Sequence, residues 1–261
     1  MPEIVTALTL AAMRQKGEKI VCLTAYDATS ASILDEAGVD VLLVGDSLGN
    51  VIQGDKTTLK VTLDEVAYHT RCVARSVRRS LLVADLPFGS YQASAEQAVL
   101  SSVELIKAGA SAVKLEGAYT EAIRAIVMAG IPVMGHAGMT PQSVNAFGGF
   151  KVQGRAEGAE KVRRDSLAIQ DAGAFSIVLE LVPAELAREI TESLKIPTIG
   201  IGAGPHCSGQ IQVWHDILGL GPEVFRHAKA YLHGRDLFKG AIGAYVAEAK
   251  SGAFPGKENS F

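Results

Sequence analysis

Short apolar runs alternate with longer amphipathic stretches along most of this 261-residue chain. Each run is almost free of polar residues, which is typical of parallel strands buried on both faces. We therefore predict seven strands and, with a weaker pattern, an eighth near Gln212–Leu218. The seven are Ile20–Ala25, Val39–Val44, Ser80–Ala84, Ser111–Leu115, Ile131–Met134, Phe175–Leu179 and Ile196–Ile201.

Helical segments follow the predicted strands. Thr62 with Glu65 three residues later forms a capping-box pattern, and Gly109 is one of several glycines placed to end a helix. The predicted helices are Ala28–Ala37, Leu63–Val77, Ala95–Ala108, Glu121–Ala129, Gly158–Ala172 and Ala184–Leu194, with one or two more in Phe225–Lys250.

Repeated strand-then-helix units predict one α/β domain over residues 1–261, a (β/α)8 barrel with a short N-terminal helix and a C-terminal tail. An open, doubly wound sheet is the structural alternative. That fold usually carries GxGxxG after its first strand, and this chain has no such motif there.

Composition narrows the class of protein. Hydrophobic residues make up 48% and charged residues 20%, which is enough for a core, and the net charge of −3 argues against nucleic-acid or anionic-membrane partners. Three scattered cysteines favour a reducing compartment over a disulfide framework. The first residues lack the basic segment of a signal peptide, and no apolar run approaches the ~20 residues of a membrane span. We expect a cytoplasmic protein.

The first polar residues after the apolar runs are the candidate chemistry, because a barrel brings these strand ends to one mouth. They are Asp27, Asp46 with Ser47, Asp85, Lys114 with Glu116, His136, Glu180 and the segment Gly200–Gly204. Crowded carboxylates must be neutralised, protonated or bound to a cation. Each acid alone has an ordinary alternative, as a helix cap or as part of a surface ion pair.

A hard cation suits carboxylates that have no thiolate neighbours. Asp46, Asp85 and Glu116 follow three sequential strands and are our candidate ligands for Mg²⁺, which Mn²⁺ could replace. Zinc fits less well, because the histidines form no HxxxH or HExxH pair.

Lys114 and Glu116 are two residues apart in a predicted strand and so point to the same face. Lys114 could form a Schiff base or act as a fixed cation for an anionic substrate, and a neighbouring carboxylate favours the second role. An internal ion pair without a ligand is the alternative.

Glu180 has apolar neighbours, which favour a raised pKa and a role as general base, although a capping or ion-paired acid also fits.

Three further features have two interpretations each. Gly200–Gly204 could bind a phosphate with its backbone or simply form a tight turn. His136 could contact substrate or serve as a structural hydrogen-bond partner. The long connection between Gly135 and Gly158 predicts a lid, with Asn145–Arg155 closing over the mouth, and a packed surface loop is the alternative.

Six segments taken in order carry a more specific signal: Val44–Gly49, Ala84–Phe88, Val113–Gly117, Gly135–Ser143, Phe147–Arg155 and Gly200–Gly204. Together they resemble the ketopantoate hydroxymethyltransferase family, over nearly the whole chain. The resemblance implies a TIM barrel like those of phosphoenolpyruvate-handling enzymes. It also implies the first step of pantothenate biosynthesis, in which the hydroxymethyl group of 5,10-methylenetetrahydrofolate is transferred to 3-methyl-2-oxobutanoate, giving 2-dehydropantoate.

The resemblance also implies roles for single residues. Asp46 and Asp85 match the Mg²⁺-binding aspartates, Glu116 matches a third metal-linked acid, and Glu180 matches the proton acceptor. The residues that match keto-acid-binding positions are Asp46, Ser47, Asp85 and Lys114. The family is typically a homodecamer, so we expect a homo-oligomer whose other partners are a small α-keto acid and folate.

Two other classes of protein remain as alternatives. One is a Mg²⁺-dependent lyase or mutase acting on another small α-keto acid, but such enzymes usually carry a catalytic cysteine on a mobile loop, and no Lys-Lys-Cys-Gly-type loop occurs here. The other is a non-catalytic barrel that binds an anion or acts as a scaffold. The intact set of acids and Lys114 argues against it.

Overall fold

A computed structural model describes residues 3–223 and 225–261. Met1 and Pro2, at the start of the predicted domain, and Val224 lie outside the described residues. The chain divides into two compact units, Met1–Val213 and Trp214–Phe261. The eight strands belong to the first unit.

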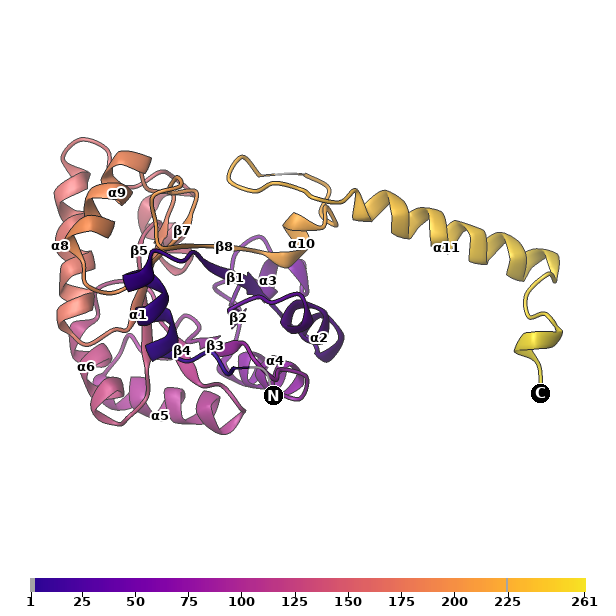
Figure 1. Ribbon diagram of the computed structural model, residues 1–261, viewed down its shortest axis with the longest axis horizontal. Helices are drawn as coiled ribbons and strands as arrows, with labels where there is room; N and C mark the ends of the chain where they lie inside the picture. The colour runs from indigo at the N-terminus through magenta and orange to yellow at the C-terminus, as the bar shows by residue number, and fades with distance from the viewer. Residues whose placement is uncertain (1–2, 224) are drawn as a thin grey trace. The chain divides into compact units, whose positions relative to one another are not determined.

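The first unit is a closed barrel of parallel strands in sequential order, with β1 also paired to β8 (Figure 1). This confirms the predicted (β/α)8 barrel. The strands are β1 (Ile20–Thr24), β2 (Val41–Val44), β3 (Leu81–Asp85), β4 (Ala112–Lys114), β5 (Val133–Gly138), β6 (Ser176–Glu180), β7 (Thr198–Ile201) and β8 (Gly209–Gln212).

The predicted position of the eighth strand is wrong. Residues Trp214–Ile217 form the short helix α10, and β8 lies earlier in the chain. Strand β8 reads Gly-Gln-Ile-Gln, so it contains no apolar run to detect. Its glycine is required by close packing, because a Cβ on Gly209 would lie 2.3 Å from the carbonyl oxygen of Ile20 on β1.

Helices cover the outside of this barrel (Figure 1). The predicted helices are confirmed close to their expected bounds, although α4 ends at Ala74 rather than Val77. The capping box at Thr62 and Glu65 is present. The helices of this unit are α1 (Ala7–Lys16), α2 (Ala28–Glu36), α3 (Leu48–Val51), α4 (Leu63–Ala74), α5 (Ala95–Lys107), α6 (Thr120–Met128), α7 (Val144–Phe147), α8 (Gly158–Asp171) and α9 (Ala184–Ser193), with a 3-10 turn at Pro141–Ser143.

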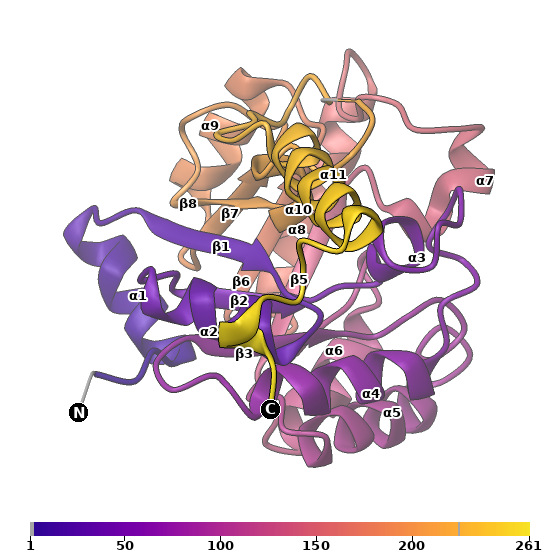
Figure 2. The same cartoon turned by 90° about the vertical axis from the view of Figure 1, so that its right-hand side faces the viewer.

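The two ends of the barrel differ in chemistry. Side chains from α1 and from the strands, among them Leu10, Ile20 and Val41, form a buried aliphatic cluster. In Figure 2, α1 lies to the left of the strands, while α3 and α7 lie to the right, the side toward which the β1 arrow points. The carboxyl ends of the strands therefore form a mouth opposite α1, and the polar residues follow the strands there.

The second unit contains α10 (Trp214–Ile217), α11 (Gly234–Ser251) and a 3-10 turn at Lys257–Asn259. Of the one or two helices predicted in Phe225–Lys250, one is present, α11. Among the described residues, no helix has the length and apolar character needed to cross a membrane.

Candidate active site

Five polar side chains are buried together at the mouth of the barrel: Asp46, Asp85, Lys114, Glu116 and His136. Asp85 and Lys114 are the last residues of neighbouring strands β3 and β4 and are paired in the register. The others lie on or directly after β2, β4 and β5. The fold thus brings together most of the polar strand-end residues that the sequence indicated.

Lys114 is held by Asp85. Its Nζ donates a hydrogen bond to Asp85 Oδ1 at 2.6 Å, and both side chains are at most 5% exposed. Burial alone would lower the pKa of Lys114, but Asp85, with Glu116 and Asp46, raises it above its usual value. Lys114 is therefore a fixed cation, and a protonated amine cannot act as the nucleophile of a Schiff base.

Asp46 is the acid with the least compensation. Burial and the charges of Asp85 and Glu116 raise its pKa well above the usual value, opposed by Lys114 and by a hydrogen bond from Gln142. Burial likewise raises the pKa of Asp85 despite its ion pair with Lys114. Two adjacent acids that resist ionisation mark a place where a further positive charge would be stabilised.

His136 lies between two carboxylates. Its Nδ1 is 3.5 Å from Glu116 Oε1, and its Nε2 is 3.3 Å from Glu180 Oε2; both are ion-pair contacts without hydrogen-bond geometry. Burial would lower the pKa of His136, but the two glutamates raise it to about 9. The pKa of Glu116 is lowered, because His136 and Lys114 outweigh its burial.

Glu180 is the more accessible of the two glutamates. Its side chain is 17% exposed, compared with 2% for Glu116. The next residue, Leu181, adopts a left-handed backbone with φ of 46°, an uncommon conformation for a large side chain. Its carbonyl accepts the backbone N–H of Gln153, which ties the long loop to the end of β6.

Two residues at predicted strand ends, Asp27 and Gly204, make contacts that serve the fold. Asp27 is exposed, accepts the N–H of Ser30 at 2.9 Å and caps α2, so it is not part of the buried cluster. In Gly200–Gly204, a Cβ on Gly204 would lie 2.4 Å from the Cβ of Ala184. Close packing against α9 accounts for that glycine.

Ser47 is half-buried, and its Oγ is 2.8 Å from the Tyr26 hydroxyl.

Sequence reasoning missed two residues that contact the cluster, Gln142 and Tyr91. The side chain of Gln142 donates to Asp46 Oδ2 at 2.9 Å, and its backbone N–H donates to Glu116 Oε2 at 2.9 Å. The Tyr91 hydroxyl accepts the N–H of Glu116 at 3.1 Å. Gln142 lies in one of the segments that carried the family resemblance, but nothing in its residue type distinguished it from a loop residue.

The residues fit a divalent cation with two protein ligands better than one with three. In the described part of the chain, no three His, Cys, Asp or Glu side chains are grouped as a metal site. Glu116, the predicted third ligand, instead contacts the Gln142 N–H and His136. Asp46 and Asp85 remain, and two carboxylates completed by water and substrate oxygens are sufficient for Mg²⁺.

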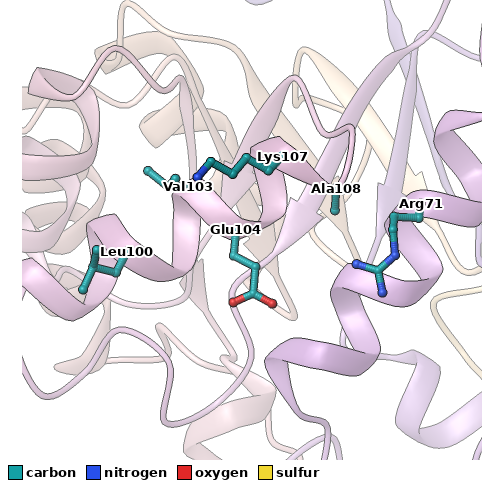
Figure 3. Close-up of a pocket in the computed structure, with 6 residues that line it drawn as sticks. All are labelled: Arg71, Leu100, Val103, Glu104, Lys107 and Ala108. Carbon is teal, nitrogen blue, oxygen red and sulfur yellow. The ribbon is translucent and has the colours of Figure 1, made fainter.

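A separate pocket of about 380 Å³ lies on the outside of the barrel between α4 and α5 (Figure 3). It is lined by Arg71, Leu100, Val103, Glu104, Lys107 and Ala108. None of the mouth acids lines it, so it is not part of the candidate active site.

Comparison with known proteins identifies the family. The family model for ketopantoate hydroxymethyltransferase matches residues 4–257. The chain belongs to the ketopantoate hydroxymethyltransferase family. It is 55% identical to 3-methyl-2-oxobutanoate hydroxymethyltransferase 1 of Burkholderia ambifaria and 56% identical to the 3-methyl-2-oxobutanoate hydroxymethyltransferase of Paraburkholderia phytofirmans. Each alignment covers 98% of this chain and 96% of the relative.

Solved structures share the fold at low identity. A phosphonopyruvate hydrolase in complex with oxalate and Mg²⁺ has a TM-score of 0.66 and 15% identity, covering 98% of this chain and 93% of that chain. A 2,3-dimethylmalate lyase, a member of the PEP mutase/isocitrate lyase superfamily, has a TM-score of 0.63 and 17% identity, covering 99% and 92%. The barrel alone therefore does not separate a ketopantoate hydroxymethyltransferase from a lyase, whereas the sequence match does.

Proposed function

We propose that this chain transfers a hydroxymethyl group from 5,10-methylenetetrahydrofolate to 3-methyl-2-oxobutanoate, giving 2-dehydropantoate, the first step of pantothenate biosynthesis. Family membership supports the reaction. The structural observation that carries the proposal is an accessible carboxylate, Glu180, beside a buried cluster that combines two acids with a fixed cation, Lys114. A base and a cation are the groups that removal of a proton next to a carbonyl requires.

Lys114 and Ser47 are the proposed keto-acid-binding residues. The ammonium of Lys114 is buried and charged, so it can attract the carboxylate of the keto acid without a change in protonation. The Ser47 hydroxyl, beside Tyr26, can donate to a second substrate oxygen. Asp46 and Asp85 contribute to the same subsite through the cation that we propose they hold.

Glu180 is the proposed proton acceptor. It removes the single C3 proton of 3-methyl-2-oxobutanoate, and the electrons move into the carbonyl to give an enolate. Water adds to the methylene carbon of the folate and both of its carbon–nitrogen bonds break, so that tetrahydrofolate leaves and formaldehyde remains. The C3 carbon of the enolate then bonds to the formaldehyde carbon, and the formaldehyde oxygen takes up the proton held by Glu180 to become the hydroxyl group. His136, whose pKa the two glutamates raise, lies with its Nε2 3.3 Å from Glu180 Oε2 and can attract that carboxylate when protonated.

Mg²⁺ is the proposed cofactor, with Asp46 and Asp85 as its ligands and Glu116 as an acid linked to it through Gln142. When bound, the ion would act as a Lewis acid that polarises the keto oxygen.

The loop after β5 is the proposed lid. Residues 148–157 contain no regular helix, and Lys151 and Arg155 are exposed. The backbone N–H of Gln153, in this loop, donates a hydrogen bond to the carbonyl of Leu181, the residue that follows Glu180. Closure over the mouth would limit access of water to the one-carbon intermediate.

A homo-oligomer, and a decamer in particular, is part of the same proposal. Helix α11 carries exposed apolar residues on one face, including Phe238, Ile242 and Val246. Such a surface is typical of an interface between chains. Mass photometry or light scattering would measure the number of subunits. A cytoplasmic location, inferred from the cysteine usage, belongs to the proposal as well.

Product analysis tests the function directly. Purified protein is incubated with Mg²⁺, 3-methyl-2-oxobutanoate and 5,10-methylenetetrahydrofolate made with a ¹³C methylene group. We expect 2-dehydropantoate carrying ¹³C in its hydroxymethyl group, detected by mass spectrometry. Unlabelled cleavage products, or no product from folded protein, would contradict the proposal and favour lyase or mutase chemistry.

A further inference from the structure

Gln142 connects acids that come from different strands. It is 5% exposed and lies in the 3-10 turn that opens the long loop after β5. Its Nε2 donates to Asp46 Oδ2 at 2.9 Å and to the Leu86 carbonyl oxygen at 3.0 Å. Its backbone N–H donates to Glu116 Oε2 at 2.9 Å. One residue therefore contacts the carboxylates that follow β2 and β4.

The orientation of the Gln142 side-chain amide is determined by its surroundings. Of the two groups facing Nε2, the Leu86 carbonyl can only accept a hydrogen bond, and the Asp46 carboxyl accepts one at Oδ2. The groups facing Oε1 are the Tyr91 hydroxyl at 2.8 Å and the Gln92 side-chain nitrogen at 3.1 Å, which can donate. Only one of the two amide orientations satisfies all four partners.

Tyr91 links the two contacts that Gln142 makes. Its hydroxyl can donate to Gln142 Oε1 at 2.8 Å or to the Glu116 carbonyl oxygen at 3.0 Å, and it accepts the backbone N–H of Glu116 at 3.1 Å. The Tyr91 ring is buried and packs edge-on against Tyr119 at a centroid distance of 5.3 Å. The hydroxyl position is therefore fixed by packing, and with it the side chain of Gln142.

We propose that Gln142, oriented by Tyr91, is a positioning residue that holds the carboxylates of Asp46 and Glu116 in the arrangement the reaction uses. A carboxylate crowded by like charges would otherwise rotate, and a hydrogen bond to one of its oxygens limits that rotation. A glutamate in place of Gln142 would instead bring another carboxyl group next to that of Asp46. This inference rests on the proposed function, because it assigns Gln142 to the same site.

The test compares Gln142→Ala with Tyr91→Phe and with a matched glutamine deletion, Gln170→Ala. Gln170 lies on α8, where its side-chain oxygen accepts the backbone N–H of Lys195, away from the mouth acids. Mn²⁺ is the probe: electron paramagnetic resonance measures its binding to each protein without substrate. A second measurement is the rate of C3 proton exchange of 3-methyl-2-oxobutanoate, and thermal unfolding checks that each variant is folded.

We expect Gln142→Ala to weaken Mn²⁺ binding by roughly 10- to 100-fold, the usual effect of removing a group that orients a metal ligand. Its exchange rate should fall at low Mn²⁺ and recover in part at saturating Mn²⁺, a pattern that general damage to the fold does not produce. Tyr91→Phe should change both quantities in the same direction by a smaller factor. Gln170→Ala should bind Mn²⁺ and exchange the proton as the unmodified protein does.

Unchanged Mn²⁺ affinity and exchange rate in a folded Gln142→Ala protein would overturn the inference. A lower melting temperature with unchanged Mn²⁺ affinity would also overturn it, since Gln142 would then serve stability alone. An unmodified protein that exchanges the proton but binds no Mn²⁺ would do the same. If Gln142→Ala weakens Mn²⁺ binding while neither protein exchanges the proton, the positioning role stands and the proposed function fails.

Discussion

Aspartates are buried near both ends of the barrel, and their surroundings shift their pKa values in opposite directions. Asp35, on α2, accepts backbone N–H groups of Arg78, Arg79 and Ser80 at 2.7–3.2 Å. Burial would raise the pKa of Asp35, but these donors and the Ser80 hydroxyl lower it. Asp46, at the mouth, faces the like charges of other acids, and its pKa is raised.

The difference separates an acid that serves the fold from one that serves a ligand. The loop before β3 completes the hydrogen bonding of Asp35 with fixed backbone donors, so its charge stabilises the folded state. At the mouth, Asp46 accepts a hydrogen bond from one side chain, Gln142. The negative charges of Asp46, Asp85 and Glu116 face only two positively charged or protonatable side chains, Lys114 and His136. A buried charge that the fold itself leaves partly uncompensated is a strong sign of a binding site.

The largest expected effect on activity comes from changing Glu180, the proposed general base. Glu180→Gln removes the proton acceptor but keeps the shape of the side chain. We expect kcat to fall by roughly 10²- to 10⁴-fold with little change in KM for the keto acid, because the base acts in the transition state. Steady-state kinetics measure both constants. A rise in KM with unchanged kcat would assign Glu180 to substrate binding instead.

Neutralising Asp46 should separate activity from stability. Asp46→Asn removes a charge that burial and neighbouring acids oppose, so we expect the free energy of unfolding to rise by about 1 kcal/mol or more. Activity should fall roughly 100-fold, because a proposed cation ligand is lost. Urea unfolding and kinetics measure the two effects. Loss of stability would contradict our account of this acid.

Neutralising Asp35 should have the reverse result. Asp35→Asn leaves backbone N–H groups facing an amide, and we expect a loss of about 1–3 kcal/mol in the free energy of unfolding at pH 7 with unchanged kcat. The pKa of Asp35 is lower folded than unfolded, so its contribution is full above about pH 4 and disappears as the pH falls through the folded value. The stability difference between the proteins should therefore shrink below about pH 4. A difference that stays constant would contradict the assignment.

The smallest expected effect concerns the loop. Trypsin should cut at Lys151 or Arg155, which are exposed, and the keto acid together with folate should slow this cleavage a few-fold. Gel analysis of timed digests measures the rate, and cleavage at sites outside the loop provides the internal control. Equal rates with and without ligands would count against a lid.

Prediction from sequence succeeded where the physical signal is local. The seven apolar runs became strands because a barrel strand is covered on both faces, and Thr62 capped α4 through contacts three residues apart. The signal failed at β8, where Gln210 is exposed and Gly209 is set by contact with Ile20 on another strand. Nothing near Gly209 in the sequence reports that contact.

The candidate site was predictable in its members more than in its connections. Topology alone places Asp46, Asp85 and Lys114 at one mouth. It does not reveal that Glu116 points to His136 and the Gln142 backbone, because those contacts depend on a turn far along the chain. It also does not separate Asp27, which caps α2, from the acids that are buried.

Our central claim is that Glu180, at the mouth of the barrel, removes the C3 proton of 3-methyl-2-oxobutanoate. The most direct measurement follows the loss of that proton signal by NMR in D₂O, with purified protein and Mg²⁺ and without folate. We expect exchange that requires both the protein and Mg²⁺ and that is absent in Glu180→Gln. No exchange with folded protein, or exchange that persists in Glu180→Gln, would contradict the account.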